Sequence, residues 1–523
     1  MRTKTVLSNA MFAKLGDAFS NVALPHTWNN LDGQDGGADY WRGIGIYNID
    51  LPNPTEGKKQ YIEIKGANHV ATVYCNGREL GTHRGGFSTF RYELTNAMNK
   101  QKNVLTVVVS NAVSDIYPQT ADFTFYGGIY RDVTFIEVDA CHFDLMKDGT
   151  EGVFVTPHCM GKTRLDVFPV NAEGAMVLVE LKDAEGNVVG AAGTEAKEHV
   201  ELIIDVKEPH LWKGMEDPYC YTAEVKLIKD EAVVDTVEVR YGYRSFRVDA
   251  ETGFWLNGKN VPLRGVARHQ DREDKGWAIS KEDQEEDIAL IKELGANTIR
   301  LAHYQHDQYF YDLCDKEGMI VWAEIPYISH HMPGGNANTL AQMEELIAQN
   351  YNHPCIVTWG ISNEITIKVT HKQDMLNNHK VLQKFVNEMD PTRPTTMACY
   401  AMCGPFNRVT KITDIVAWNL YLGWYVPFLW LNDLWIGFYH LIYPNRCLGY
   451  SEYGAEGMPN LHAEKPKRGD NTEEYQNIYH EYMIKCFKRH PYMWGTYIWN
   501  MFDFAADDRN QGGEPGMNHK GMV

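Results

Sequence analysis

Alternating apolar and polar residues run through the first half of the chain and predict short β-strands. A period of two places one face of each strand in a core. Asn76-Gly77, which ends one alternating run, is a strong signal for a hairpin. A first alternating block covers residues 1–142 and a second covers residues 143–246. We therefore predict two all-β sandwich domains in this half of the chain.

The pattern changes after Asn257-Gly258, where short apolar runs begin to alternate with helical stretches. Ser280-x-x-Asp283 resembles a capping box that opens the first helix. The runs that read as buried strands lie at residues 261–267, 296–302, 319–325, 356–363, 394–399, 414–420, 447–452 and 494–501. Eight strands with intervening helices predict a (β/α)8 barrel over residues 247–523.

The end of the predicted barrel departs from the usual pattern. Only about twenty residues follow the eighth predicted strand, and they leave no sequence for an eighth covering helix. We therefore expect a TIM barrel that lacks its last helix. The first and eighth strands should then expose apolar surface, at a cost of about 25 cal/mol for each Å².

The composition excludes several classes of function. With 44% apolar and 23% charged residues, the chain of 523 residues has the proportions of a folded soluble protein. A formal net charge of −19 disfavours nucleic acid as a partner, and no apolar run reaches the roughly 18 residues that span a bilayer. The ten cysteines are scattered without a C-x-x-C pair, as in reduced proteins. We expect a cytoplasmic protein that binds neither nucleic acid nor membrane.

Two glutamates end predicted barrel strands, where a barrel carries its chemistry. Glu364 follows the fourth strand, directly after Asn363, and Glu452 ends the seventh strand. Each could be a solvated residue at the start of a loop. Two carboxylates across a cleft, however, are the requirement for acid-assisted cleavage of a glycosidic bond, and their separation decides whether configuration is retained or inverted.

Histidines and aromatic residues follow other predicted strands. His269 and His303 come after the first and second strands, Tyr421 after the sixth and Trp499 in the eighth. A single histidine or aromatic residue is more often structural than functional. Grouped on one rim, the histidines could bind sugar hydroxyls and the aromatic rings could stack on a pyranose.

Four motifs that occur in order along the chain together resemble glycoside hydrolase family 2. They are Gly265-Val266-Ala267-Arg268-His269, Asn297-Thr298-Ile299-Arg300, Asn363-Glu364 and Ser451-Glu452-Tyr453-Gly454. In addition, Leu24–Trp28 and Phe125–Asp132 look like the jelly-roll sugar-binding domain of that family. The resemblance implies a jelly roll over residues 1–142, an immunoglobulin-like sandwich over 143–246 and a catalytic barrel over 247–523.

The resemblance also implies a role for each candidate residue. Glu364 matches the general acid/base and Glu452 the nucleophile of a retaining mechanism, as the strand-end argument also suggests. The remaining matches are Asn363 for the sugar 2-hydroxyl, His269, His303 and Trp499 for glycone contacts, and Tyr421 for the tyrosine beside the nucleophile.

The sequence leaves two substrates open. Asp122 resembles a carboxylate that the amino-terminal domain contributes to a galactose pocket, where it would repel a uronate. Asn518-His519-Lys520, in contrast, fits the Asn-x-Lys pattern with which β-glucuronidases bind the uronic carboxylate. We favour a β-galactosidase, with a β-glucuronidase as the alternative. A carbohydrate-binding relative without activity is a further possibility if the incomplete barrel fails to hold the carboxylates in place.

We expect no metal and no cofactor. Large metal-dependent β-galactosidases of this family carry an acidic ligand and a histidine after the third strand. Here His330 is kept but Ile328 stands where the acid would fall, so magnesium dependence is not expected. The predicted partner is a small carbohydrate substrate, and the resemblance allows a homo-oligomer.

Overall fold

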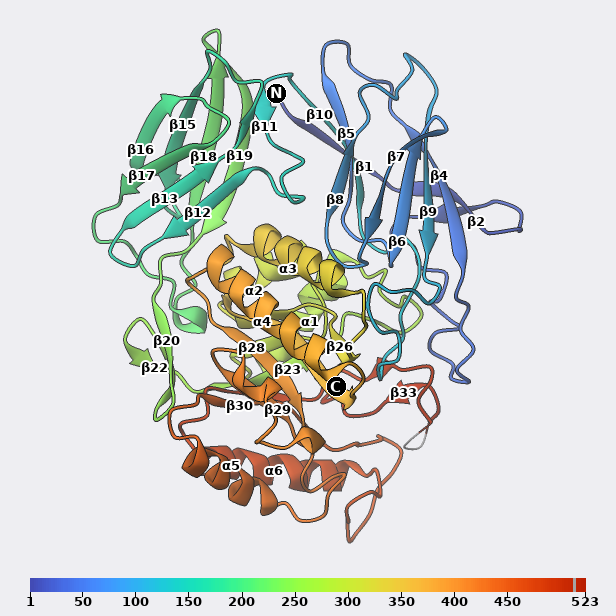
Figure 1. Ribbon diagram of the computed structural model, residues 1–523, viewed down its shortest axis with the longest axis vertical. Helices are drawn as coiled ribbons and strands as arrows, with labels where there is room; N and C mark the ends of the chain where they lie inside the picture. The colour runs from blue at the N-terminus through green and yellow to red at the C-terminus, as the bar shows by residue number, and fades with distance from the viewer. Residues whose placement is uncertain (511–513) are drawn as a thin grey trace.

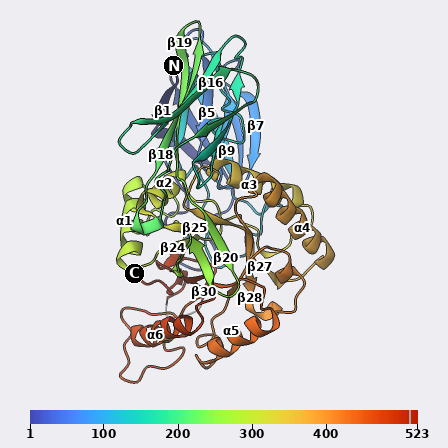
Figure 2. The same ribbon diagram turned by 90° about the vertical axis from the view of Figure 1, so that its left-hand side faces the viewer.

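The computed structural model describes residues 1–510 and 514–523. Two β-sandwiches lie side by side and a barrel lies below both of them (Figure 1). The same arrangement is visible after a rotation of 90° (Figure 2). The predicted class of two β-sandwiches followed by a TIM barrel is confirmed.

The first sandwich is a jelly roll built from two antiparallel sheets. Its strands are β1 (Thr3–Leu7), β2 (Asn9–Lys14), β3 (Ser20–Ala23), β4 (Ile44–Leu51), β5 (Lys59–Ile64), β6 (Val70–Cys75), β7 (Arg78–Arg84), β8 (Phe90–Glu93), β9 (Asn103–Ser110) and β10 (Val133–Val138). The sheets have the orders β1-β10-β5-β8 and β3-β2-β4-β9-β6-β7. Alternate residues of β9, Leu105, Val107 and Val109, are fully buried between the sheets. Asn76 and Gly77 both have positive φ and form the predicted two-residue hairpin turn between β6 and β7.

The second sandwich has an immunoglobulin-like arrangement of two smaller sheets. Its strands are β11 (His142–Phe143), β12 (Val153–Pro157), β13 (Lys162–Val167), β14 (Pro169–Val170), β15 (Met176–Lys182), β16 (Val188–Glu195), β17 (Val200–Asp205), β18 (Tyr221–Lys229) and β19 (Ala232–Tyr241). The main sheets have the orders β12-β13-β17 and β16-β15-β18-β19, with a short β11-β14 pair beside them. Buried valines and leucines from both sheets form one apolar core.

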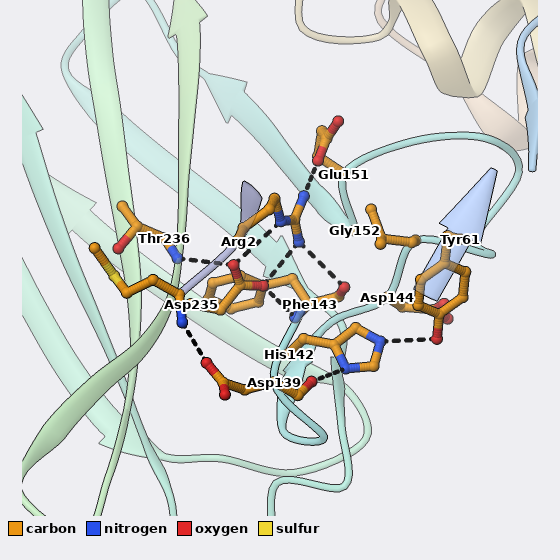
Figure 3. A network of polar contacts seen from close by, with 12 residues as sticks. Arg2, Tyr61, Asp139, His142, Phe143, Asp144, Glu151, Gly152, Asp235 and Thr236 are labelled. Carbon is orange, nitrogen blue, oxygen red and sulfur yellow. Dashed lines mark hydrogen bonds and ion pairs between the residues drawn. The ribbon is translucent and has the colours of Figure 1, made fainter. Parts of the chain in front are cut away.

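A buried ion network joins the two sandwiches (Figure 3). Arg2, which directly precedes β1, donates from Nη2 to Asp235 Oδ2 on β19 at 2.7 Å and from Nε to Asp235 Oδ1 at 3.1 Å. It also pairs with Glu151. The side chain of Arg2 is 8% exposed and that of Asp235 is fully buried. Since a buried charge without a partner is costly, this pair holds the chain start against the second sandwich.

Replacing Arg2 should therefore destabilise this junction. Arg2→Met leaves the Asp235 carboxylate buried without its cation, and we expect the free energy of unfolding to fall by about 3 kcal/mol. Lys4→Met is the matched control, because the half-exposed Lys4 binds only Glu151 and should lose less than about 1 kcal/mol. Urea denaturation measures both values. Equal stability of the two variants would contradict the assigned role of Arg2.

A small sheet leads from the sandwiches into the barrel. Its strands are β20 (Phe246–Asp249), β21 (Gly253–Leu256) and β22 (Lys259–Asn260), and the one-turn 3₁₀ helix η1 (Gly214–Glu216) precedes them. Asn257 and Gly258 have positive φ and form the turn between β21 and β22, as the sequence predicts.

The barrel contains the eight predicted parallel strands. They are β23 (Leu263–Arg268), β24 (Thr298–Leu301), β25 (Ile320–Glu324), β27 (Ile356–Lys368), β28 (Thr395–Tyr400), β29 (Val416–Asn419), β30 (Leu448–Tyr453) and β31 (Gly495–Ile498). Pairing of β31 with β23 and of β25 with β27 closes the barrel. The short strand β26 (Ile328–His330) lies beside the end of β27.

Helices cover most of the barrel. They are α1 (Lys281–Glu293), α2 (Gln308–Glu317), α3 (Asn336–Asn350), α4 (Lys372–Met389), α5 (Leu431–Ile442) and α6 (Glu473–Arg489). Ser280 and Asp283 form the predicted capping box at the start of α1. Within residues 1–510 and 514–523, no helix is long and apolar enough to cross a bilayer.

Two connections depart from a regular barrel. The expected helix between β28 and β29 is replaced by the short 3₁₀ helices η2 (Ala401–Cys403) and η3 (Val409–Lys411), because Gly404-Pro405 breaks the helical pattern. After β31, the described residues form the strands β32 (Phe504–Ala505) and β33 (Met517–Asn518) and no helix, as the sequence predicts.

The apolar surface expected to be exposed on the first and eighth strands is instead covered. Leu263 and Val266 on β23 and Tyr497 on β31 are fully buried. The guanidinium of Arg264 lies over the ring of Phe487 on α6, 5.6 Å from its centroid. Backbone hydrogen bonds from Met501 to Ala267 and from Met522 to Met501 also hold the last residues against the barrel. The expectation of exposed strands was therefore wrong.

Candidate active site

Glu452 lies at the carboxyl end of its barrel strand, as predicted, whereas Glu364 lies four residues before the end of its strand instead of after it. Glu364 belongs to β27, which is buried up to Asn363, and Glu452 is 5% exposed on β30. The backbone of Glu364 has φ 49°, a left-handed conformation that is rare for a residue with a side chain. Such backbone strain persists where the surrounding structure enforces it, and it is concentrated at functional sites.

Arg300 on β24 connects the ends of several strands. Its Nη1 donates to Glu452 Oε1 at 2.8 Å, and its Nη2 donates at 2.9 Å to both Glu324 Oε1 and Asn363 Oδ1. Arg300 is fully buried. Burial by itself would lower its pKa, but the carboxylates of Glu324 and Glu452 raise the pKa above the usual value. The guanidinium is thus a fixed positive charge beneath the site.

One further contact orients Glu452. The hydroxyl of Tyr421 donates to Glu452 Oε2 at 2.7 Å, so both carboxylate oxygens accept a hydrogen bond from a buried or half-buried group. Burial, together with the negative charge of Glu452, raises the pKa of Tyr421 well above its usual value, which keeps this hydroxyl a donor. Glu452 therefore has one fixed orientation.

Glu364 is set apart from Glu452 by its environment. Burial, and secondly the negative charge of Glu452, raises the pKa of Glu364 to about 8. Asn419, which donates from Nδ2 to Asn363 Oδ1 at 3.2 Å, opposes this rise through a hydrogen bond to Glu364. A carboxyl whose pKa is raised in this way keeps its proton at neutral pH and can act as a general acid.

The residues predicted to contact a sugar ring gather beside this pair. The rings of His303 and Trp499 stack at 4.9 Å between centroids, and the ring of His269 stands edge-on to Trp499 at 5.3 Å. His269 Nδ1 lies 2.9 Å from the hydroxyl of Tyr304, whereas its buried Nε2 has no partner among the described residues. An unpaired buried nitrogen suits a ligand hydroxyl.

A second group of charged residues lies on the side formed by the last residues of the chain. Lys520, 1% exposed, donates from Nζ to Glu456 Oε1 at 2.8 Å, and Asn518 Nδ2 donates to Asp122 Oδ2 at 3.1 Å. The Nζ of Lys520 lies 5.8 Å from the ring centroid of Tyr421, the residue that binds Glu452. Asp122, Asn518 and Lys520, predicted from separate motifs, are thus brought to the same site.

The free Asp122 carboxylate expected from the sequence is not observed. Arg509 forms an ion pair with Asp122 and a second one with Glu456. Asp122 therefore faces the site with its charge balanced and with a hydrogen bond from Asn518. The argument that Asp122 would repel a uronate loses its basis.

Sequence reasoning missed several residues of the site. They are Asn419, Glu456 and Arg509, together with Arg300, which was quoted only as part of a motif and given no role. The role of Arg300 could have been found from its charge within an otherwise apolar strand, since buried charges are rare and paired. The loop that carries Arg509 shows no such signal.

The described residues include three clusters that could hold a metal ion, and none of them contains a residue of this site. They are Asp315 with His353 and Cys355, Asp433 with Cys486 and His490, and Asp35 with Asp39 and Asp507. Within the first, His353 Nδ1 lies 2.6 Å from Asp315 Oδ2, a contact that accounts for the cluster without an ion.

Two carboxyls near the ends of barrel strands, beside packed histidine and aromatic rings, have the arrangement of a glycosidase site. Family models agree with this class. Models described as glycosyl hydrolases family 2 match residues 12–138 (sugar binding domain), 151–244 and 247–522 (TIM barrel domain). The chain belongs to glycosyl hydrolase family 2.

Named relatives include both activities considered above. A β-glucuronidase of Bacteroides fragilis is 37% identical over 96% of this chain and 76% of its own length. An FMN-binding β-glucuronidase from Facaelibacterium prausnitzii L2-6 has a similar structure, with a TM-score of 0.97 and 42% identity over 100% of this chain and 83% of that one. A putative β-galactosidase from Bacteroides fragilis has a TM-score of 0.95 and 30% identity, with coverage of 100% and 83%.

The pKa of Glu364 offers a direct test of the coupling between the two carboxyls. Glu452→Gln removes the negative charge that contributes to the raised pKa, so the pKa of Glu364 should fall from about 8 and yet stay above 4.5, because burial remains. Carbon-13 NMR of labelled glutamate carboxyls measures the titration. Glu481→Gln on the exposed face of α6 is the control and should change nothing. An unchanged pKa in Glu452→Gln would show that the two groups are not coupled.

Proposed function

We propose that the protein hydrolyses β-D-glucuronides with retention of configuration. The observation that carries the proposal is the position of Lys520, a buried ammonium beside Tyr421, which itself binds the proposed nucleophile. A buried cation beside the residue that binds the proposed nucleophile suits the carboxylate of a uronic acid. The β-glucuronidases among the relatives support the same substrate.

In the proposed first step, Glu452 attacks the anomeric carbon and the bond to the aglycone oxygen breaks. Glu364 gives its proton to the leaving oxygen, which a pKa of about 8 permits at neutral pH. Formation of the glycosyl ester consumes the charge of Glu452, and with it one of the causes that hold the pKa of Glu364 high. Glu364, ionised since it gave its proton to the leaving oxygen, therefore stays ionised and accepts a proton from the water that cleaves the ester.

The other side chains have supporting roles in this proposal. Asn363 binds the sugar 2-hydroxyl, while His269, His303 and Trp499 bind the remaining hydroxyls and one face of the ring. Asn518 and Lys520 bind the uronic carboxylate. Catalysis of this kind requires no metal or cofactor, because the chain itself supplies the acid and the nucleophile.

β-Galactosidase activity, which we favoured from the sequence, remains the second candidate. The putative β-galactosidase of Bacteroides fragilis shares the fold at 30% identity. The pairing of Asp122 with Arg509 weakens the charge argument for this activity, and the relatives favour the glucuronide. A catalytically impaired carbohydrate-binding protein is the weaker reading, because the fold supplies both carboxyls and Arg300 and Tyr421 hold Glu452 in place. A small carbohydrate as partner, a homo-oligomeric state and a cytoplasmic location remain proposals.

Parallel hydrolysis of p-nitrophenyl β-D-glucuronide and p-nitrophenyl β-D-galactoside tests the proposal. We expect the glucuronide to be cleaved with the higher kcat/KM. Glu452→Gln should lower this value by at least about a thousandfold, because the nucleophile is lost. Activity on the glucuronide should decline as the pH rises through about 8, where Glu364 loses the proton that it must donate. Preferential cleavage of the galactoside would instead support the second candidate.

A further inference from the structure

Arg509 connects the two acidic residues of the uronate side of the site. Its Nη1 binds Asp122 and its Nη2 binds Glu456, while Lys520 binds the same Glu456 oxygen as Arg509. The side chains of Arg509 and Glu456 are each 4% exposed, and that of Asp122 is 52% exposed. The group thus extends from buried residues to an exposed carboxylate at the surface.

The four charges are arranged unevenly. Within the buried part, Lys520 and Arg509 share the single negative charge of Glu456, so this part carries one net positive charge. Asp122 lies outside it and is held by Arg509 and by the amide of Asn518. A substrate carboxylate that approaches Lys520 therefore meets a region of net positive charge. The negative charge of Asp122 does not repel it, because Asp122 is paired with Arg509.

We propose that Arg509 is a positioning residue that determines specificity for an acidic sugar, an inference that rests on the proposed glucuronidase function. It neutralises the charge of Asp122. It also pairs with Glu456, so that the negative charge of Glu456 neutralises Lys520 only in part. Without Arg509, Lys520 and Glu456 form a neutral pair, and Asp122 adds one uncompensated negative charge. The same cleft then repels a uronate and still accepts a neutral sugar.

The chain offers a matched pair of substitutions for the test. Arg509→Gln should lower kcat/KM for p-nitrophenyl β-D-glucuronide by at least about tenfold, mostly through KM. The substitution removes a positive charge near the substrate carboxylate, and unlike charges attract each other strongly at a buried site. For p-nitrophenyl β-D-galactoside the value should change by less than about threefold, since a neutral sugar does not sense the charge. Arg489→Gln, which removes an exposed arginine paired with Asp433 on the far helices, is the control for loss of one positive charge.

A second substitution separates a charge effect from a structural one. In the double variant Arg509→Gln/Asp122→Asn, the uncompensated charge is removed, so most of the lost kcat/KM for the glucuronide should return. Asp122→Asn alone leaves Arg509 in place and should raise the ratio of glucuronide to galactoside kcat/KM. This single variant also tests the idea if Arg509→Gln fails to fold.

Different results overturn the two proposals. If the wild-type chain cleaves the glucuronide but Arg509→Gln lowers both substrates equally, or the double variant does not recover, Arg509 has no role in specificity. If the wild-type chain does not cleave the glucuronide, the proposed function fails. Calorimetric binding of D-glucuronate and D-galactose to the same variants then decides the role of Arg509 independently of catalysis: an unchanged ratio of the two affinities in Arg509→Gln overturns it.

Discussion

The site depends on one buried cation. Arg300 lies below the strand ends and binds Glu324, Asn363 and Glu452 with hydrogen bonds of 2.8 to 2.9 Å. Its guanidinium also covers the ring of Trp322, 4.9 Å from the centroid. The planar fork of an arginine fixes the direction of every group that it binds. If the cation were absent, Glu324 and Glu452 would be two buried carboxylates without a counterion, which would destabilise the fold.

From this constraint follows the difference between the two carboxyls that we propose as catalytic. Arg300 and Tyr421 hold Glu452 as an acceptor, whereas Glu364 is half-buried and faces the charge of Glu452. Burial and that charge together keep the proton on Glu364. The same logic recurs beside Lys520, where Arg509 pairs with Asp122 and with Glu456. In each half of the site an arginine pairs with two carboxylates and balances negative charge.

Periodicity and strand ends were sufficient to predict much of this molecule. The eight barrel strands, the hairpin at Asn76-Gly77 and the positions of Glu364 and Glu452 all follow from local pattern, because a barrel brings its strand ends together whatever the loops do. The helix expected between β28 and β29 failed for a local reason that was visible in Gly404-Pro405.

What the sequence could not predict depends on contacts between distant segments. Arg509 reaches Asp122 across 387 positions, and no spacing rule connects a loop of the barrel with a loop of the first sandwich. One reason for which we favoured the galactoside, the repulsion of a uronate by Asp122, did not take this ion pair into account. Likewise, β23 is covered by the side chain of Arg264 and by the last residues of the chain. The sequence pattern showed only that the last helix is absent and predicted neither of these contacts.

Trapping of the glycosyl-enzyme tests the central claim most directly. A β-glucuronyl fluoride with fluorine in place of the 2-hydroxyl should slow hydrolysis of the intermediate and leave a covalent adduct, which peptide mass spectrometry locates. The account predicts an adduct on Glu452, with much slower labelling by the corresponding galactosyl fluoride. An adduct on another residue, no adduct with an enzyme that does cleave glucuronides, or faster labelling by the galactosyl compound would contradict it.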